Sequence, residues 1–307
     1  PVVGASVTGV VLGVAVAAKR KPGPALAPGI AFAAKTVLQV SVVVLGFQLS
    51  IPQVLQVGAS SLPVLLGTLA MCLAGAYWIG RWLGIVGDLR TLIGTGTGIC
   101  GASAIAAVTP VIGAAEVEVS YAISTIFVFN IAAVLLFPLI GHALGLGQRS
   151  FGLFAGTAVN DMSSVVATAT TYGSVAANHA IVVKLTRTLL IIPICLGLAA
   201  LRQRAAPSRE RSRSRVRVGR LVPLFLMGFV VAAAVNSTGL IPHAAHHSFG
   251  LVGAFLITVA LSAIGLSTDF AGLRRTGPRP LILGALLWVL VSVTSLGLQW
   301  ATGGFGG

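Results

Sequence analysis

The chain has 307 residues, of which 56% are hydrophobic and only 8% are charged, and its mean hydropathy is +0.99. A soluble domain of this length does not carry such a composition, so the sequence predicts an all-α polytopic membrane protein. The net charge of +14 does not indicate nucleic-acid binding, because the basic residues sit in short loops and not on one continuous face.

Apolar runs of about 20 residues, the length that crosses a bilayer as a helix, recur along the whole chain. In order they are 2–18, 30–49, 62–83, 89–110, 117–141, 151–171, 179–201, 221–236, 249–266 and 281–300. The sequence therefore predicts about ten transmembrane segments that form one transporter domain over residues 1–307. Because the chain begins with Pro1 and not with Met, we expect an N-terminal piece, with room for another helix, to be missing.

Basic residues mark alternate loops of this segment map. They follow the first segment, flank the loop after the third, crowd residues 202–220 and occupy the last loop, 274–279. The loops between them hold almost no Lys or Arg, which is the positive-inside pattern of a cytoplasmic side. We expect a multi-pass protein of the bacterial cytoplasmic membrane, with residues 202–220 as a basic cytoplasmic linker between helices.

Two look-alike stretches lie inside these apolar segments. They are Gly96 to Ala107 (GTGICGASAIAA) and Gly156 to Ala167 (GTAVNDMSSVVA), and both begin with Gly-Thr. The second places Asn160 and Asp161 where hydrocarbon is expected. A bilayer tolerates such backbone only when protein or trapped water surrounds it. The pattern predicts two interrupted or re-entrant helices in a core domain, and these two stretches as the substrate site.

The direction of the two stretches stays open at the level of sequence. A weaker repeat links Leu45–Ser50 with Ile264–Asp269, an odd number of helices apart, which favours an inverted-repeat, antiporter-like architecture. If the Gly-Thr stretches cross the whole membrane they run parallel, and if they are re-entrant hairpins they become inverted. Loop charge hardly distinguishes full crossing from re-entry, because only Arg149 and the pair Glu116 and Glu118 change side between the two arrangements.

Asp161 is the acidic residue that the segment map places at bilayer depth. The other five lie in or beside loops and are expected to be solvated: Asp88, Glu116, Glu118, Glu210 and Asp269. A buried carboxylate costs roughly 2.5 to 3.5 kcal/mol on the insertion scale, so Asp161 must be paired, hydrated or protonated. Its candidate partners, Lys184 and Arg187, are three residues apart and share one helical face. We expect Asp161 to be the coupling site, and the two cations to be an anion clamp or the counter-charge that is freed when Asp161 is protonated. The structural alternative is an internal salt bridge that locks two helices.

The rest of the predicted site comes from the interrupted helices. Such a break exposes N–H groups and the positive end of a half-helix, which favour an oxyanion. The predicted substrate-binding and ion-binding residues are Thr97, Gly98, Cys100, Gly101, Ser103, Thr157, Asn160, Asp161, Ser163, Lys184 and Arg187. The alternative for the glycines is close helix packing, and isolated hydroxyl groups more often pack or bond back to their own helix.

No cofactor and no metal site are expected, beyond H⁺ or Na⁺ as a coupling ion. The chain has no Walker-type phosphate loop, no HExxH motif and no Ser/His/Asp set at one depth, so we do not expect an enzyme.

The same stretches carry a resemblance to a known family. Together with KTVLQVSVVVLGFQLS (Lys35–Ser50) and VKLTRTLLIIP (Val183–Pro193), they resemble the YeiH-type membrane proteins, which carry the label of sulfate exporters. That resemblance groups the chain with sodium/proton antiporters and bile-acid-type symporters, and implies a scaffold panel beside a core with two crossing, interrupted helices. The family pattern often has His-Glu where this chain has Asn160 and Asp161, which argues against an imidazole that takes up a proton there.

We therefore expect a secondary transporter that exports a small anion. The resemblance favours sulfate or a related sulfur oxyanion, coupled to protons or sodium. The alternatives are a cation/proton antiporter that uses Asp161, and an anion channel. The expected partners are the small anion and membrane lipid, without nucleic acid, and a homodimer and a monomer are equally compatible with the sequence.

Overall fold

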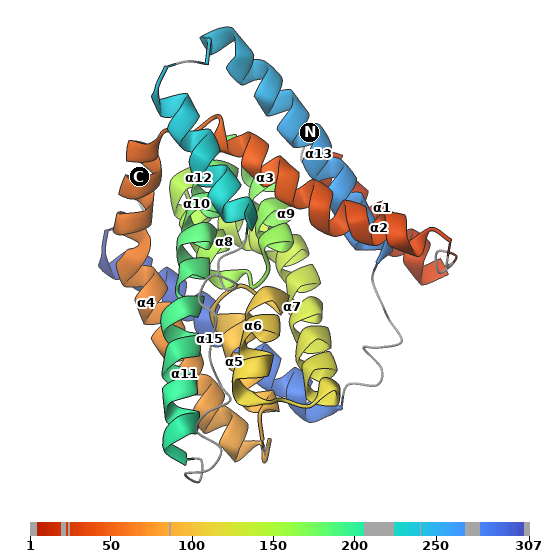
Figure 1. Ribbon diagram of the computed structural model, residues 1–307, viewed down its shortest axis with the longest axis vertical. Coiled ribbons are helices and arrows are strands. Elements are labelled where there is room, and N and C mark those ends of the chain that lie inside the picture. Colours follow the sequence, from red (N-terminus) through yellow and green to blue (C-terminus); the bar gives the residue numbers. More distant parts are fainter. Residues whose placement is uncertain are drawn as a thin grey trace.

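The computed structural model describes residues 5–19, 23, 25–85, 87–205, 224–239, 241–267 and 277–303, and every regular element in these ranges is a helix (Figure 1). In chain order the helices are α1 (Ala5–Lys19), α2 (Ala27–Phe32), a π-helical turn (Ala33–Val37), α3 (Leu38–Gly46), α4 (Ile51–Trp82), α5 (Leu89–Gly98), α6 (Ala102–Ile112), α7 (Glu116–Ala143), α8 (Gln148–Ala158), α9 (Met162–Tyr172), α10 (Ser174–Leu189), α11 (Ile191–Ala205), α12 (Leu224–Ser237), α13 (His243–Leu266) and α15 (Pro278–Ala301).

The predicted helical class is confirmed, and each predicted apolar segment falls on one to three of these helical elements. Within the described ranges, six apolar helical stretches are long enough to cross a membrane, namely Ala27–Gly46, Ile51–Trp82, Glu116–Ala143, Ser174–Arg202, Ser248–Leu266 and Pro278–Ala301. The other predicted segments are shorter helices or, at 89–110 and 151–171, helices with a break in the middle.

Four helical stretches pack together as one layer, which we call the panel: α1, α2–α3, α12 and α13. Glycines permit the close approach, since a Cβ on Gly13 would lie 2.9 Å from Gly265 Cα, and one on Gly46 would lie 2.8 Å from the carbonyl oxygen of Phe229. Figure 1 shows the panel lying obliquely across the upper part of the molecule.

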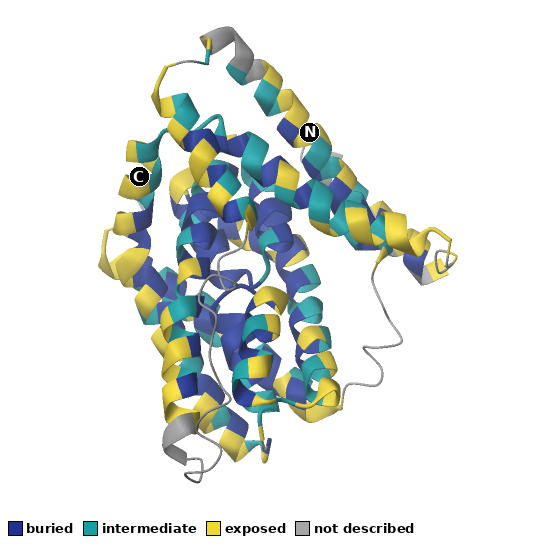
Figure 2. Ribbon diagram, viewed as in Figure 1, coloured by how far each residue is buried: buried dark blue, intermediate teal, exposed yellow. Residues whose placement is uncertain are grey.

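The remaining helices, α4 to α11 and α15, form the core. Helix α15 packs antiparallel to α4, because Gly67 meets Leu298 and Gly75 meets Leu290. Figure 2 shows that buried residues gather inside the core, while the outer faces are exposed. These outer faces carry large apolar side chains, such as Trp78 and Leu139, as a lipid-facing surface does.

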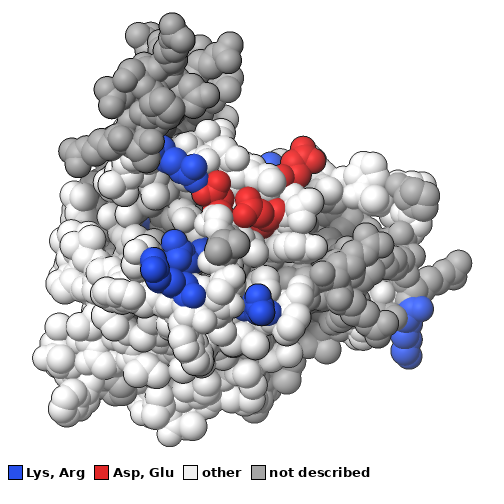
Figure 3. All heavy atoms as spheres, turned by 90° about the horizontal axis from the view of Figure 1, so that it is seen from below, with Lys and Arg blue, Asp and Glu red and all other residues white. Residues whose placement is uncertain are grey.

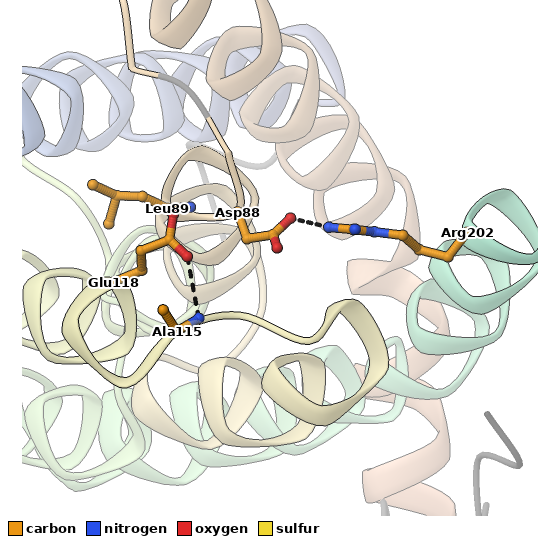
Figure 4. A network of polar contacts seen from close by, with 5 residues as sticks. All are labelled: Asp88, Leu89, Ala115, Glu118 and Arg202. Carbon is orange, nitrogen blue, oxygen red and sulfur yellow. Dashed lines mark hydrogen bonds and ion pairs between the residues drawn. The ribbon is translucent and has the colours of Figure 1, made fainter. Parts of the chain in front are cut away.

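Helices α5 and α6 form a hairpin, which we call the first hairpin. Glu118, in the first turn of α7, accepts hydrogen bonds from the backbone N–H of Leu89 (3.3 Å) and of Ala115 (3.2 Å) (Figure 4). Leu89 begins α5, and Ala115 lies just past the end of α6. The chain therefore enters the core along α5 and returns along α6 to the end from which it started.

Helices α8 and α9 form the second hairpin. The side-chain oxygen of Gln148, the first residue of α8, accepts hydrogen bonds from Val175 N (3.1 Å) and Ala176 N (3.3 Å), just past the end of α9. The Tyr172 ring stacks on Phe151 at 3.8 Å. Because α7 runs for 28 residues between the two hairpins, they enter the core from opposite ends.

The end that holds the start of α5 and the end of α6 is the lower end in Figure 1, and Figure 3 shows its charged face. Asp88 pairs there with Arg202 of α11 (Figure 4), and a Cβ on Gly84 would lie 3.8 Å from the guanidinium of Arg279. Three of the acids predicted to be solvated, Asp88, Glu116 and Glu118, belong to this end, partly or fully exposed. Glu210, Asp269 and most of the predicted 202–220 linker lie outside the described residues.

Candidate functional site

Both predicted helix interruptions are confirmed. Helix α5 ends at Gly98 and α6 begins at Ala102, and Gly101 between them has φ +69°, a positive value that favours glycine. Helix α8 ends at Ala158, and the backbone at Val159 and Asp161 is extended before α9 begins.

The two breaks touch each other. A Cβ built on Gly101 would lie 3.1 Å from Asp161 Cβ, 3.3 Å from Asp161 Cα and 3.5 Å from the carbonyl carbon of Asn160. The neighbouring residues Ile99 and Val159 are fully buried. We call the two breaks, residues 98–101 and 159–161, the crossing. Only a glycine at position 101 permits so close an approach of the hairpin tips.

Lys184 of α10 bridges the two breaks. Its ammonium group donates to the carbonyl oxygen of Ile99 at 2.9 Å and to that of Val159 at 2.8 Å. The side chain is 0% exposed. One buried cation is thus bonded to the first and to the second hairpin at once.

Arg187, one turn further along α10, completes the same arrangement. Its Nε donates to Gly98 O (2.7 Å), one terminal nitrogen donates to Thr97 O (2.8 Å), and the other donates to Thr157 O. This side chain is also 0% exposed. The planar guanidinium group matches carbonyl oxygens that lie side by side in space but belong to two different helices.

These carbonyl groups need such donors. The last carbonyls of a helix have no partner within it, and they carry the negative end of the helix dipole. Helices α5 and α8 both end at the crossing, so their negative ends converge there. The two buried side chains satisfy the free carbonyls, and the negative helix ends stabilise a positive charge on either of them without a carboxylate partner.

Small residues in α8 let α10 lie close enough for Lys184 and Arg187 to make these hydrogen bonds. Gly152 and Gly156 of α8 are four apart, and a Cβ on either would come within 3.0 Å of α10, at Ala176, Ala180 or Val183. The backbones of α8 and α10 therefore lie in contact, as in the small-xxx-small packing of membrane helices.

Asp161 serves as the N-cap of α9. Its carboxylate accepts hydrogen bonds from the backbone N–H of Ser163 (3.1 Å) and from the Ser163 hydroxyl group. The side chain is partly exposed. Among the described residues no ion pair joins Asp161 to Lys184 or Arg187, whose nitrogen atoms bond to carbonyl oxygens. The alternative of a salt bridge that locks two helices is therefore not what the structure contains.

The other predicted residues divide into two groups. Gly98, Cys100, Gly101 and Thr157 are buried at the crossing, as is Thr97. The Thr157 hydroxyl bonds back to Leu153 O at 2.7 Å, which is the packing role that the sequence favoured for isolated hydroxyls. Ser103 lies in the first turn of α6 and is exposed.

Sequence reasoning missed three residues of this neighbourhood. Asn130 of α7 is 5% exposed, and its side-chain oxygen accepts from the backbone N–H of Asp161 at 3.2 Å. On α15 the Ser295 hydroxyl lies 2.6 Å from that of Thr157, and the Gln299 amide donates to Ser295. For Asn130 the signal in the sequence was a lone amide in an apolar segment. For Ser295 and Gln299 it was a pair of polar residues four positions apart.

One buried acceptor at the crossing has no partner. Asn160 is 1% exposed, and its side-chain oxygen makes no hydrogen bond, although nearly all buried polar atoms do. An oxygen of this kind can accept a bond from a donor or bind a cation.

Comparison with known proteins places the chain in a family. A family profile described as conserved hypothetical protein 698 matches residues 1–284. A UPF0324 membrane protein of Streptococcus pyogenes serotype M18 is 41% identical over 99% of this chain and 91% of its own length. Another from Clostridium tetani is 38% identical over 90% of this chain and 83% of its own length. The chain belongs to the UPF0324 membrane protein family. No solved structure matches it.

Proposed function

We propose that this UPF0324 protein is a secondary transporter for a small anion, with its binding site at the crossing. The observation that carries the proposal is the contact of two interrupted helices, held by two buried cations that bond only to main-chain carbonyls. Broken helices whose ends converge inside a membrane protein supply binding groups for ions. The preference for sulfate or a related sulfur oxyanion rests on the resemblance to YeiH-type proteins.

We propose that both hairpins are re-entrant and that they form the centre of an inverted repeat. The support is the return of each hairpin to its own end, at Glu118 for the first and Gln148 for the second. In this arrangement the described helices cross the bacterial cytoplasmic membrane eight times, as α1, α2–α3, α4, α7, α10–α11, α12, α13 and α15. Arg81, Arg90, Arg202 and Arg279 then all face the cytoplasm, as the positive-inside rule requires.

Exposed residues border the crossing on one side, and we propose that side as the anion site. Helix α6 begins there at Ala102, and the first N–H groups of a helix have no partner within it. Ala102 and Ser103 are exposed, in contrast to the closed side, where Lys184 and Arg187 cover the helix ends. The two cations therefore act as fixed charges behind the anion and not as its direct clamp.

The balance of charge supports an anion. Lys184 and Arg187 contribute two positive charges, Asp161 contributes one negative charge, and each helix end adds roughly half a charge of its own sign. The two C-terminal and two N-terminal helix ends cancel, so about one positive charge remains for the substrate to neutralise.

Asp161 is the proposed coupling site. A proton or Na⁺ at its carboxylate removes a negative charge from the crossing, so it strengthens anion binding, and the anion strengthens cation binding in turn. The unpartnered oxygen of Asn160 is available as a further ligand for Na⁺. Ion and anion then move together, and an anion that accumulates in the cell drives its own export.

Flux into proteoliposomes tests the proposal. Radiolabelled sulfate and sulfite are supplied with an imposed proton or sodium gradient, and the protein is compared with Asp161→Asn. Asn is as good an N-cap as Asp, so the variant should fold normally. We expect saturable anion flux that responds to one gradient, and loss of that response in Asp161→Asn. Full gradient-driven flux in the variant would refute the coupling role.

Asp161 and Asn160 also favour a second candidate, a cation/proton antiporter. That function predicts ²²Na⁺ flux that needs no anion and is lost in Asp161→Asn. An anion channel predicts a conductance that saturates poorly and needs no counter-ion. The same proteoliposomes separate all three functions.

A further inference from the structure

A polar cavity of about 550 Å³ lies at the upper end of the core, apart from the crossing. Its lining comes from the end of α3, the first half of α4, the start of α8 and the first half of α10. The residues are Gln48, Leu49, Gln53, Gln56, Val57, Ser60, Arg149, Val175, Asn178, His179 and Val182. We propose that this cavity is a binding site for a small oxyanion, at the end of the molecule opposite to the basic face.

Two helices build the cavity with the same spacing. From α4 come residues 53, 56, 57 and 60, and from α10 come residues 175, 178, 179 and 182. Each set follows the i, i+3, i+4, i+7 pattern, so it occupies one helical face. In a membrane protein such a face is expected to be apolar, yet here five of the eight side chains are glutamine, asparagine, histidine or serine, and they line the same cavity. A polar ligand or water explains the pattern, and lipid does not.

The charge of the cavity selects the sign of the ligand. Arg149 is its one residue with a fixed charge, and no Asp or Glu is among the lining residues. The described residues form no ion pair with Arg149. The carboxylates at Asp88, Glu116 and Glu118 belong to the lower end. An unpaired guanidinium group in a cleft attracts an anion, and its fork of donors matches carboxylate, sulfate or phosphate oxygens.

The amide groups supply further donors. Gln56 and Asn178 bring amide nitrogens to the cavity lining, whereas the side-chain nitrogen of Gln48 is buried toward Gly250 of α13, where a Cβ would lie 3.6 Å from it. The side-chain oxygen of Gln53 accepts from Ser50 N at 3.0 Å, which fixes its orientation and leaves its nitrogen to face other partners. Neutral amides around one guanidinium group suit an anion, because the amide nitrogens donate hydrogen bonds and the one fixed charge of the lining is positive.

The inference does not depend on the proposed transport. If transport occurs, the cavity is the vestibule at which the anion meets the protein on the side opposite the cytoplasm. If transport is absent, the same residues still predict anion binding.

Thiol labelling tests the site in the intact protein reconstituted in lipid nanodiscs. Ser60→Cys places a thiol on the cavity wall with little change of shape, and the native cysteines Cys72, Cys100 and Cys195 are buried. The rates of reaction with an anionic and a cationic methanethiosulfonate reagent are measured, with and without sodium sulfate, against sodium chloride at matched ionic strength. Intact-mass spectrometry, with unsubstituted protein as the baseline, reports the modification.

We expect Arg149→Gln in the Ser60→Cys background to lower the anionic-to-cationic rate ratio by about two- to five-fold, as the loss of one nearby charge requires. Arg149→Lys should keep most of the ratio, and Arg279→Gln, the same charge change at the lower end, should leave it unchanged. Sulfate should slow labelling only when residue 149 is basic.

An equal fall in Arg279→Gln, or no sulfate protection with Arg149 intact, would overturn the site. Protection that persists in Asp161→Asn separates this cavity from the crossing. Loss of coupled flux in that variant therefore tests the proposed function and leaves this inference untouched.

Discussion

The two hairpins are alike at the C-terminal ends of their first helices but differ at the N-terminal ends of their second helices. The C-terminal ends of α5 and α8 have the same hydrogen-bond donors, because Lys184 and Arg187 donate to both. The N-terminal ends differ: α6 starts after Gly101 without a side-chain cap, whereas α9 starts with Asp161 as its cap. The shared half holds the crossing together, and at the unequal half the anion and the coupling ion proposed above would meet different ligands.

The largest expected effect comes from the shared half. Arg187→Met leaves three buried carbonyls without donors, so we expect a loss of about 3 to 5 kcal/mol in the free energy of unfolding. Arg279→Met removes the same charge at the lower end and should change stability by less than about 0.5 kcal/mol. Thermal unfolding of the detergent-solubilised protein measures both. Equal stability of the two variants would mean that the carbonyl bonds do not hold the crossing.

The contact between the tips is tested by a pair of glycines. Gly101 (φ +69°, ψ −133°) and Gly113 (φ +70°, ψ +32°) both have a positive φ, although only Gly113 lies in the left-handed helical region, and a Cβ meets Asp161 at the first and nothing within 4 Å at the second. Gly113→Ala should cost about 1 to 2 kcal/mol for the backbone alone. Gly101→Ala should cost about 1 to 3 kcal/mol more, because alanine adopts the Gly101 backbone less readily and because the Cβ forces the tips apart. Thermal unfolding gives the difference, and identical losses would show that the hairpin tips are not in contact.

The attachment of the first hairpin to the lower end should give the smallest effect. Glu118→Ala removes the acceptor for Leu89 and Ala115, so we expect a loss of about 1 to 2 kcal/mol. Glu116 is exposed on the same turn, and Glu116→Ala should stay within about 0.5 kcal/mol of the unsubstituted protein. Urea unfolding in mixed micelles suits differences of this size. The account fails here if Glu116→Ala is the more destabilising of the two.

Sequence predicted the pieces of this site better than their contacts. The Gly-Thr stretches were expected to break helices, and Lys184 and Arg187 were expected to share a face, because both follow from residue type and spacing. The partners of the two cations could not be predicted, since they are main-chain carbonyls, and every residue carries one. The same holds for Gly101, whose closeness to Asp161 depends on two hairpins that are about 60 residues apart in the chain.

The direction of the hairpins was beyond the sequence for a different reason. Full crossing and re-entry differ only in the side given to Arg149, Glu116 and Glu118, which is too little charge for the positive-inside rule. The structure adds the bonds of Glu118 and Gln148, which join the start and end of each hairpin. Asn130 stayed hidden because a lone asparagine in an apolar helix has no spacing partner to mark it.

Side-specific labelling of single cysteines tests the opposed hairpins most directly. A membrane-impermeant maleimide is applied to intact cells and to inside-out vesicles that carry Ala115→Cys or Gln148→Cys, with Arg81→Cys and Ser174→Cys as markers of the two sides. We predict that residue 115 reacts only in inside-out vesicles, together with residue 81, and that residue 148 reacts in intact cells, together with residue 174. Reaction of residue 115 from outside and of residue 148 from inside would mean that both stretches cross the membrane fully, and would contradict the account.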